Sequence, residues 1–283
     1  MLTYLKGNLL TSPAQVLVNT VNTVGVMGKG IALEFKNRYP EMFKLYQREC
    51  DNKNIDVGNL LLWKDEEKWI LLFPTKKHWR SPSKTDYIEK GLDKFVKSYE
   101  ALGIESVAFP RLGCGNGGLD WNDVKPIMEY YLKQLPIHIY IYIDKYVESE
   151  PEYKQPTEIE KWLRNNPESV GFTKLKEDLQ NIITNDNNIL INSELKHISW
   201  NDSGIHLING RDIFISEDDL CDFWEYVRNV GVLQTDKLPQ RFAEYGTLML
   251  EIFRRLDYVQ PIILSKNGFD FIDKSNGYQY INI

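Results

Sequence analysis

Residues 16–35 read VLVNTVNTVGVMGKGIALEF, and this stretch decides the fold that the sequence predicts. Its first three residues are apolar and mostly β-branched, which is typical of a buried strand. A glycine-rich turn follows at residues 25–30, and helix-forming residues begin at Ile31. This order of elements places a glycine loop and a helix N-terminus together, where several backbone N–H groups have no hydrogen-bond partner within the chain. Such N–H groups favour binding of a phosphate. The turn matches neither GxGxxG nor GxxxxGK, so the two commonest nucleotide-binding motifs are excluded, and a plain tight turn is the alternative interpretation.

The composition limits the class of protein. A chain of 283 residues is long enough for one large domain or two ordinary ones. Its 42% hydrophobic and 26% charged residues are typical of a soluble globular protein. No apolar run approaches about 18 residues and no charged-then-apolar leader opens the chain, so we expect no membrane span and no signal peptide. Three scattered cysteines are too few for a disulfide framework, which favours the reducing cytoplasm.

The charge is distributed unevenly along the chain. Residues 1–150 carry 20 Lys+Arg against 19 Asp+Glu, whereas residues 151–283 carry 14 against 21. A nearly neutral half can approach a polyanion, and an acidic half can attract a basic protein. A merely soluble acidic domain is the simpler interpretation of the second half.

The order of the predicted elements indicates two domains. Along residues 1–148, strands alternate with amphipathic helices, which predicts an α/β domain with a mixed, largely parallel sheet between helix layers. Residues 149–156 are acidic and flanked by prolines, and we interpret them as a linker. Short strands, hairpin turns and two helices follow, so residues 157–283 are predicted to form a smaller α+β domain.

A second glycine-rich loop, at residues 113–118, follows another predicted strand. Ligands of open α/β sheets bind beyond the carboxyl ends of the strands, where both glycine loops are expected to lie. Two such loops can close around an extended ligand such as a diphosphate, with backbone N–H groups as the donors. Asn19 and Asn22 end the first strand, and they either cap it or hold a ribose hydroxyl.

Lys76 and Lys77 follow an apolar strand at residues 69–74. Most lysines are solvated surface residues, which is the simplest interpretation of both. However, a loop that leaves a buried strand can partly desolvate a lysine, and a neighbouring cation also disfavours the charged form. Both effects would provide some neutral amine at about neutral pH, as a nucleophile or a base requires.

The remaining reactive residues favour structural interpretations. No motif pairs Cys114 with a histidine, which a nucleophilic cysteine usually needs. A packing role is therefore favoured over a role as a nucleophile. Asp120 and Asp123 most simply begin a helix. No metal site is expected, because the four histidines are dispersed without zinc spacing, at His78, His138, His197 and His206.

Several motifs together resemble one known family. These motifs are KGNL at residues 6–9, VNTVN at 18–22, GKGIA at 28–32 and PRLGCG at 110–115. In this order and spacing they resemble the macrodomain family over about residues 1–145, which implies the three-layer macrodomain fold for residues 1–148. FPTKK at 73–77 and GCGNGGLDW at 113–121 more narrowly resemble the DarG-type DNA ADP-ribosyl glycohydrolase antitoxins and the related terminal ADP-ribose protein glycohydrolase.

This resemblance implies an ADP-ribose site without a cofactor or metal, in which Lys76 is the catalytic residue. Asn8 and Leu9 would lie near the adenine. The distal ribose and the diphosphate would be bound by Thr20, Val21, Asn22, Gly28, Lys29, Gly30, Ile31, Thr75, Gly113, Cys114, Gly115, Asn116 and Gly117.

The resemblance also implies an activity and partners. DarG-type proteins remove ADP-ribose from thymidine in single-stranded DNA, which reverses the DarT-type ADP-ribosyltransferase toxin, and the second domain would bind that toxin. A macrodomain that only reads ADP-ribose is the alternative.

The chain departs from its relatives at two positions. Many macrodomains have an aspartate where Asn8 stands, and the protein glycohydrolase has one where Gly117 stands. An acid-assisted mechanism would therefore need Asp120 to reach the site, and otherwise the chemistry relies on Lys76.

Overall fold

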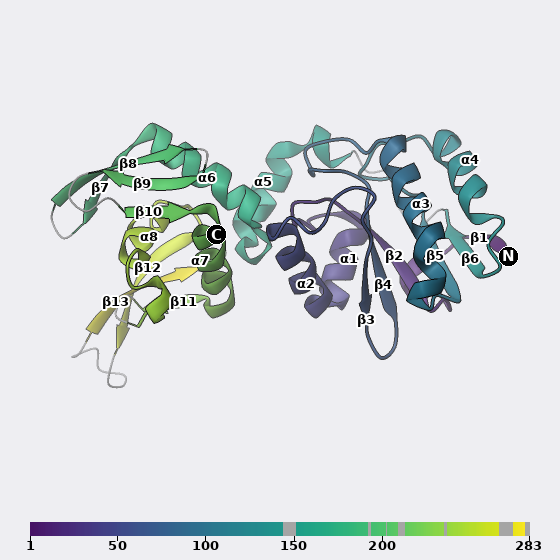
Figure 1. The fold of residues 1–283 in the computed structure, drawn as a ribbon, viewed down its shortest axis with the longest axis horizontal. Helices are drawn as coiled ribbons and strands as arrows, with labels where there is room; N and C mark the ends of the chain where they lie inside the picture. Colours follow the sequence, from purple (N-terminus) through teal and green to yellow (C-terminus); the bar gives the residue numbers. More distant parts are fainter. Residues whose placement is uncertain are drawn as a thin grey trace. The chain divides into compact units, whose positions relative to one another are not determined.

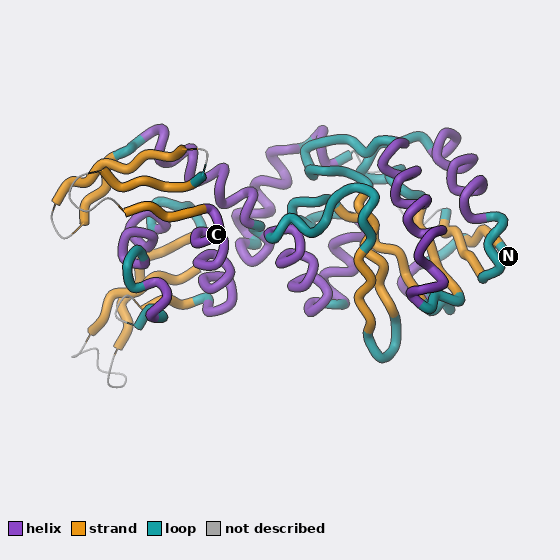
Figure 2. Tube along the Cα trace, viewed as in Figure 1, coloured by secondary structure: helices purple, strands orange, loops and turns teal. Residues whose placement is uncertain are grey.

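The computed structural model describes residues 1–143, 151–191, 194–201, 203–208, 213–234, 237–265 and 274–280 (Figure 1). Within these ranges the chain forms two compact units, residues 1–161 and residues 162–283. Both units contain helices and strands (Figure 2). Residues 149 and 150 of the predicted linker lie outside the described residues.

A six-stranded sheet forms the centre of the first unit, in the order β1-β6-β5-β2-β4-β3. All neighbouring pairs are parallel except β3 and β4, which are antiparallel. The prediction of a mixed, largely parallel sheet is therefore confirmed. The strands are β1 (Leu2–Leu5), β2 (Val16–Val21), β3 (Leu61–Lys64), β4 (Trp69–Pro74), β5 (Ser106–Pro110) and β6 (His138–Tyr142).

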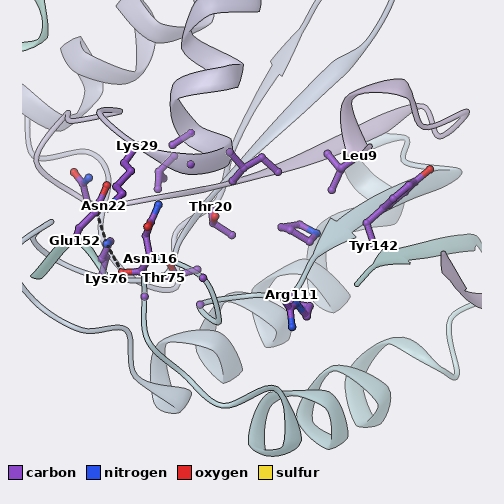
Figure 3. A pocket seen from close by; sticks show the side chains of 18 of the residues that line it. Leu9, Thr20, Asn22, Lys29, Thr75, Lys76, Arg111, Asn116, Tyr142 and Glu152 are labelled. Carbon is purple, nitrogen blue, oxygen red and sulfur yellow. Dashed lines mark hydrogen bonds and ion pairs between the residues drawn. The ribbon is translucent and has the colours of Figure 1, made fainter. Parts of the chain in front are cut away.

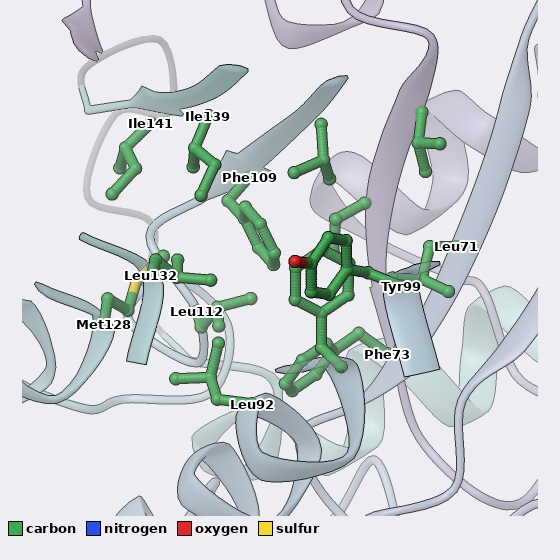
Figure 4. Close-up of a cluster of buried hydrophobic side chains, with 14 of the residues drawn as sticks. Leu71, Phe73, Leu92, Tyr99, Phe109, Leu112, Met128, Leu132, Ile139 and Ile141 are labelled. Atoms are coloured by element: carbon green, nitrogen blue, oxygen red, sulfur yellow. The ribbon is translucent and has the colours of Figure 1, made fainter. Parts of the chain in front are cut away.

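Helices cover both faces of this sheet. One buried cluster joins the sheet to α1 (Gly30–Arg38) and α2 (Pro40–Asp51), and a second joins the opposite face to α3 (Thr85–Leu102) and α4 (Trp121–Leu132). Alternate residues of β4 enter the two clusters, because successive side chains of a strand point to opposite faces. Ile70 and Leu72 thus pack on α1 and α2, while Leu71 and Phe73 belong to the second cluster, shown in Figure 4. This explains why the strands read as continuous apolar runs.

The parallel order brings three loops to one edge of the sheet. β2 pairs with β4 on one side and with β5 on the other, so the carboxyl ends of all three strands lie together. The first glycine loop follows β2, the loop with Lys76 follows β4, and the second glycine loop follows β5. This edge is where a ligand of an open α/β sheet binds.

The first unit extends beyond β6 to residue 161. The sequence predicted a linker at residues 149–156 and a second domain from residue 157, whereas the division of the structure falls later, within α5 (Pro156–Asn165). The reason is a set of polar contacts between this segment and the body of the first unit, described below. We call residues 151–161 the strap; it contains the short helix η2 (Glu152–Lys154) and the first residues of α5.

The second unit is α+β, as predicted. Its antiparallel four-stranded sheet has the order β10-β9-β8-β7 and its three-stranded sheet the order β11-β13-β12. The buried side chains Phe223, Trp224, Phe242 and Phe253 form part of its core. Its elements are η3 (Pro167–Ser169), α6 (Phe172–Asn185), β7 (Asn188–Ile191), β8 (Glu194–Asn201), β9 (Gly204–Ile208), β10 (Ile213–Ser216), α7 (Glu217–Val230), β11 (Val232–Gln234), η4 (Gln240–Phe242), α8 (Gly246–Phe253), β12 (Val259–Ser265) and β13 (Lys274–Tyr280).

Candidate active site

A pocket of the first unit opens at the shared carboxyl edge of β2, β4 and β5 (Figure 3). It brings together most of the residues that the sequence singled out. The predicted residues that line it are Leu9, Thr20, Val21, Asn22, Lys29, Gly30, Ile31, Thr75, Lys76, Gly113, Gly115, Asn116 and Gly117.

Three predicted residues do not belong to the lining. Asn8 caps the short helix η1 (Leu9–Thr11), where its side chain accepts a hydrogen bond from the Leu10 N–H at 3.1 Å. Gly28 is buried within the first glycine loop. Cys114 directs its Sγ to the carbonyl of Leu112 at 3.5 Å, and burial raises the pKa of its thiol to about 12. A thiol that stays protonated is a poor nucleophile, which agrees with a packing role for Cys114.

The two glycine loops meet at the pocket. Gly30 has φ +59°, and a Cβ atom at this position would lie 2.4 Å from Nδ2 of Asn116 in the second loop. Only glycine allows both the left-handed backbone and this close approach. The loops can therefore present backbone N–H groups to the same ligand.

Asn22 holds the first loop in its conformation. Its Nδ2 donates to the Val26 carbonyl at 2.7 Å, and its Oδ1 accepts from the Val24 N–H at 3.0 Å and from the Tyr46 hydroxyl at 3.1 Å. Of the two interpretations left open by the sequence, the structure supports the capping role. A ribose contact of Asn22 stays a prediction.

Lys76 is buried, contrary to the interpretation as a surface lysine. Only 7% of its side chain is exposed, and its Nζ lies 2.6 Å from Oε2 of Glu152 and 3.3 Å from the Asn116 carbonyl (Figure 3). Lys77 has 60% of its side chain exposed and faces Asp56 at 3.9 Å. The charged group next to Lys76 is therefore a carboxylate, and not the neighbouring lysine that the sequence suggested.

Glu152 is a charged residue of the pocket lining that sequence reasoning missed. It lines the pocket although 75 residues separate it from Lys76 in the chain, and it belongs to a segment interpreted as a linker. Among the described residues that line the pocket, Glu152 is the only acidic one. No local motif marks it, because its position depends on how the strap folds back on the first unit.

The acids considered from the sequence lie elsewhere. Asp120 caps α4, where its Oδ1 accepts from the Asn122 N–H at 2.8 Å, and it is not part of the lining. At Gly117 a Cβ atom would lie 2.2 Å from Oγ of Ser83 and 2.4 Å from the Gly113 carbonyl oxygen. This position therefore has no room for an aspartate without a shift of the surrounding loop.

The opposite end of the pocket has a different chemistry. Leu9, Arg111 and Tyr142 lie there, away from Lys76 (Figure 3). An apolar side chain, a planar cation and an aromatic ring suit a flat heterocycle. The sequence did not assign Arg111 or Tyr142 to the site. The lining residues outside the prediction are Gly7, Val26, Ala32, Pro110, Arg111, Tyr142, Ile143 and Glu152.

Among the described residues, no three or more His, Cys, Asp or Glu side chains lie close enough together to hold a metal ion. Nor is any helix there long and apolar enough to cross a membrane.

Comparisons with known proteins agree with this geometry. Residues 18–128 match the family model of the Macro domain. A DNA ADP-ribosyl glycohydrolase of Mycobacterium tuberculosis is 51% identical over 140 residues, which cover 48% of this chain and 40% of the relative. One from Thermus aquaticus is 42% identical over 147 residues, covering 50% of this chain and 41% of the relative. The solved structure "Thermosipho africanus DarTG in complex with ADP-ribose" has 40% identity and a TM-score of 0.50, and covers 51% of this chain and 42% of that chain. The match thus spans about two fifths of the length of these curated relatives.

Proposed function

The first unit of this chain is a macro domain, and from this membership we propose that the chain is a DNA ADP-ribosyl glycohydrolase of the cytoplasm. It would remove ADP-ribose from thymidine in single-stranded DNA and so reverse an ADP-ribosyltransferase toxin. The names of relatives with 42% and 51% identity support this activity. So does the likeness to the solved structure of a DarTG protein in complex with ADP-ribose.

The observation that carries the proposal is the position of Lys76. Its amine is buried in the pocket, within reach of a ligand that lies between the two glycine loops. A lysine is costly to bury, and a module that only binds ADP-ribose has no need of one at this point.

The geometry suggests how the residues would act. Backbone N–H groups of the two loops would hold the diphosphate, and the end with Leu9 and Tyr142 would take the adenine. The distal ribose would then lie at the end with Lys76. There the lysine would act on the anomeric carbon C1″, either as a nucleophile through ring opening or as an electrostatic participant.

The test measures release of ADP-ribose from a thymidine-ADP-ribosylated, single-stranded oligonucleotide. Lys76→Ala is expected to abolish release and to retain ADP-ribose binding. Lys77→Ala is the matched control, because the neighbouring side chain is exposed and outside the pocket lining. Equal release by the parent and by Lys76→Ala would contradict the proposed role. Binding without release by the parent would identify a reader of ADP-ribose.

We also propose that the second unit binds the toxin, which would be basic because it handles DNA. The excess of acidic residues after residue 150 supports this partner. A relative from Thermosipho africanus, named as a fusion of a DNA ADP-ribosyl transferase and a DNA ADP-ribosyl glycohydrolase, joins the two activities in one chain and is 39% identical over 161 residues. A purely structural or oligomerisation unit is the alternative.

Charge reversal on the exposed face of α7 tests this partner. Asp218 and Asp222 are exposed one helical turn apart, and their joint change to lysine is expected to weaken binding of the cognate transferase to the full chain. The control is the change of Asp86 on α3 to lysine, which reverses a charge in the first unit and not on α7. A complex unaffected by the α7 change, or the absence of any complex, would contradict the proposal.

A further inference from the structure

We propose, on the basis of the function proposed above, that Glu152 is a second catalytic residue, which transfers protons together with Lys76. The two side chains are 8% and 7% exposed, and Oε2 of Glu152 lies 2.6 Å from Nζ of Lys76. Both residues line the pocket, so both can reach a bound substrate.

Stability alone does not explain this pair. Removing two charges from water opposes much of their attraction, and buried ion pairs are often no more stabilising than apolar side chains of the same size. Both side chains also line the pocket, where an acid and a base held side by side can exchange protons with a ligand.

Two contacts of the strap, both C-terminal to Glu152, attach it to the body of the first unit. Oε1 of Gln155 accepts a hydrogen bond from Nζ of Lys29 in the first glycine loop at 2.8 Å. Farther along, Oε1 of Glu160 lies 2.5 Å from Nη2 of Arg80. These contacts place the carboxylate of Glu152 within the first unit and hold it at the pocket.

The second glycine loop is shaped to receive the strap. Gly118 has φ +77°, and a Cβ atom there would lie 2.6 Å from the hydroxyl of Tyr153, the residue after Glu152. Glycine at this position thus permits both the left-handed backbone and the close approach of the strap. The strap contributes the acid that Gly117 has no room for and that Asp120, as a helix cap, does not supply.

The bond to be broken joins C1″ of the distal ribose to a nitrogen of thymine. The Glu152 carboxylate accepts one proton from a water molecule, whose oxygen forms the new bond to C1″. Lys76 acts here as a cation, the second of the two routes given above, and not as a nucleophile. Its ammonium gives a proton to the thymine nitrogen, which keeps the electron pair of the broken bond. The proton on Glu152 then returns to the Lys76 amine across the 2.6 Å contact. Both side chains regain their first state, and one water molecule is consumed.

The experiment measures steady-state release of ADP-ribose by the full chain, with Glu152→Gln as the main variant. The amide keeps the shape of the side chain and cannot accept the proton. We expect kcat to fall by about 100-fold or more, the usual range for loss of a general base, with KM and ADP-ribose affinity little changed. The acidic limb of the pH–rate profile is expected to disappear in this variant.

Two further variants separate catalysis from support of the strap. Glu160→Gln weakens a contact that holds the strap but leaves the Glu152 carboxylate in the chain, so its loss of kcat is expected to be much smaller than that of Glu152→Gln. Glu152→Asp keeps a carboxylate on a shorter side chain and is expected to be faster than Glu152→Gln.

The outcomes are distinguishable. The inference is overturned if Glu152→Gln is as fast as the parent, or if its kcat falls no more than that of Glu160→Gln. It is also overturned if Glu152→Gln raises KM and leaves kcat unchanged. Equal rates for Glu152→Asp and Glu152→Gln also overturn it. If the parent chain itself releases no ADP-ribose, the proposed function fails, and the inference falls with it.

Discussion

Replacing Lys76 with methionine is expected to destabilise the first unit by about 3–5 kcal/mol, the usual effect of removing one partner of a buried ion pair. Methionine keeps most of the apolar stem and removes the charge. The Glu152 carboxylate, whose side chain is 8% exposed, would then be left in the pocket wall without its cation. For a domain of this size, each kcal/mol lowers the melting temperature by about 2–4 °C, so the expected decrease is about 6–20 °C.

Scanning calorimetry of the full chain measures this effect. The chain has two compact units, so the transition of the first unit must be identified before it is compared. If the proposed function holds, ADP-ribose binds only the folded first unit and is expected to raise the melting temperature of that transition in the parent. The same transition is then followed in each variant.

Two controls make this prediction specific to the pair. Lys77→Met removes an exposed lysine and is expected to change stability by less than about 1 kcal/mol. The double variant Lys76→Met with Glu152→Leu replaces both charges with apolar groups and is expected to regain most of the lost stability. Either of two results refutes this prediction: Lys76→Met has the melting temperature of the parent, or the double variant is no more stable than Lys76→Met.

Three further predictions follow from the same geometry. The raised pKa of the Cys114 thiol, about 12, keeps it protonated at pH 8, so iodoacetamide is expected to alkylate it far more slowly than free cysteine at the same pH. Cys114→Ala is expected to keep the release rate, and rapid alkylation of Cys114 in a peptide map would contradict this. Gly117→Asp is expected to weaken ADP-ribose binding in calorimetric titrations, because its Cβ would lie 2.4 Å from the Gly113 carbonyl oxygen, and unchanged affinity would show that the loop adapts. Asp120→Ala is expected to lower the free energy of unfolding by about 1 kcal/mol through loss of a helix cap, and to leave the release rate unchanged. A variant that folds stably but releases ADP-ribose slowly would indicate that Asp120, and not Glu152, is the catalytic acid.

The sequence predicted the first unit well because its signals are local. Apolar strands followed by glycine loops determine a largely parallel sheet, and a parallel sheet brings its loops to one edge. Lys76 lies two residues after the end of β4, so the sequence allowed a partly desolvated lysine there but favoured a surface one, and the structure shows it buried.

The missed features depend on contacts between distant parts of the chain. Glu152 lies in an acidic segment with prolines, and only the folding of that segment onto Lys29, Arg80 and Gly118 reveals its position. The side chain of Asn8 accepts a hydrogen bond from a backbone N–H at the start of η1, a role that asparagine favours and that the sequence did not indicate. Its contact with a ligand stays a prediction.

The central claim is that the full chain breaks the bond between C1″ and thymine, and intact-mass spectrometry of both products tests it most directly. After incubation with a thymidine-ADP-ribosylated oligonucleotide, the account predicts the unmodified oligonucleotide and free ADP-ribose in equal amounts, and neither product with Lys76→Ala. An oligonucleotide that stays fully modified while ADP-ribose binds would contradict the claim, and so would one that keeps the ribose after cleavage within the diphosphate.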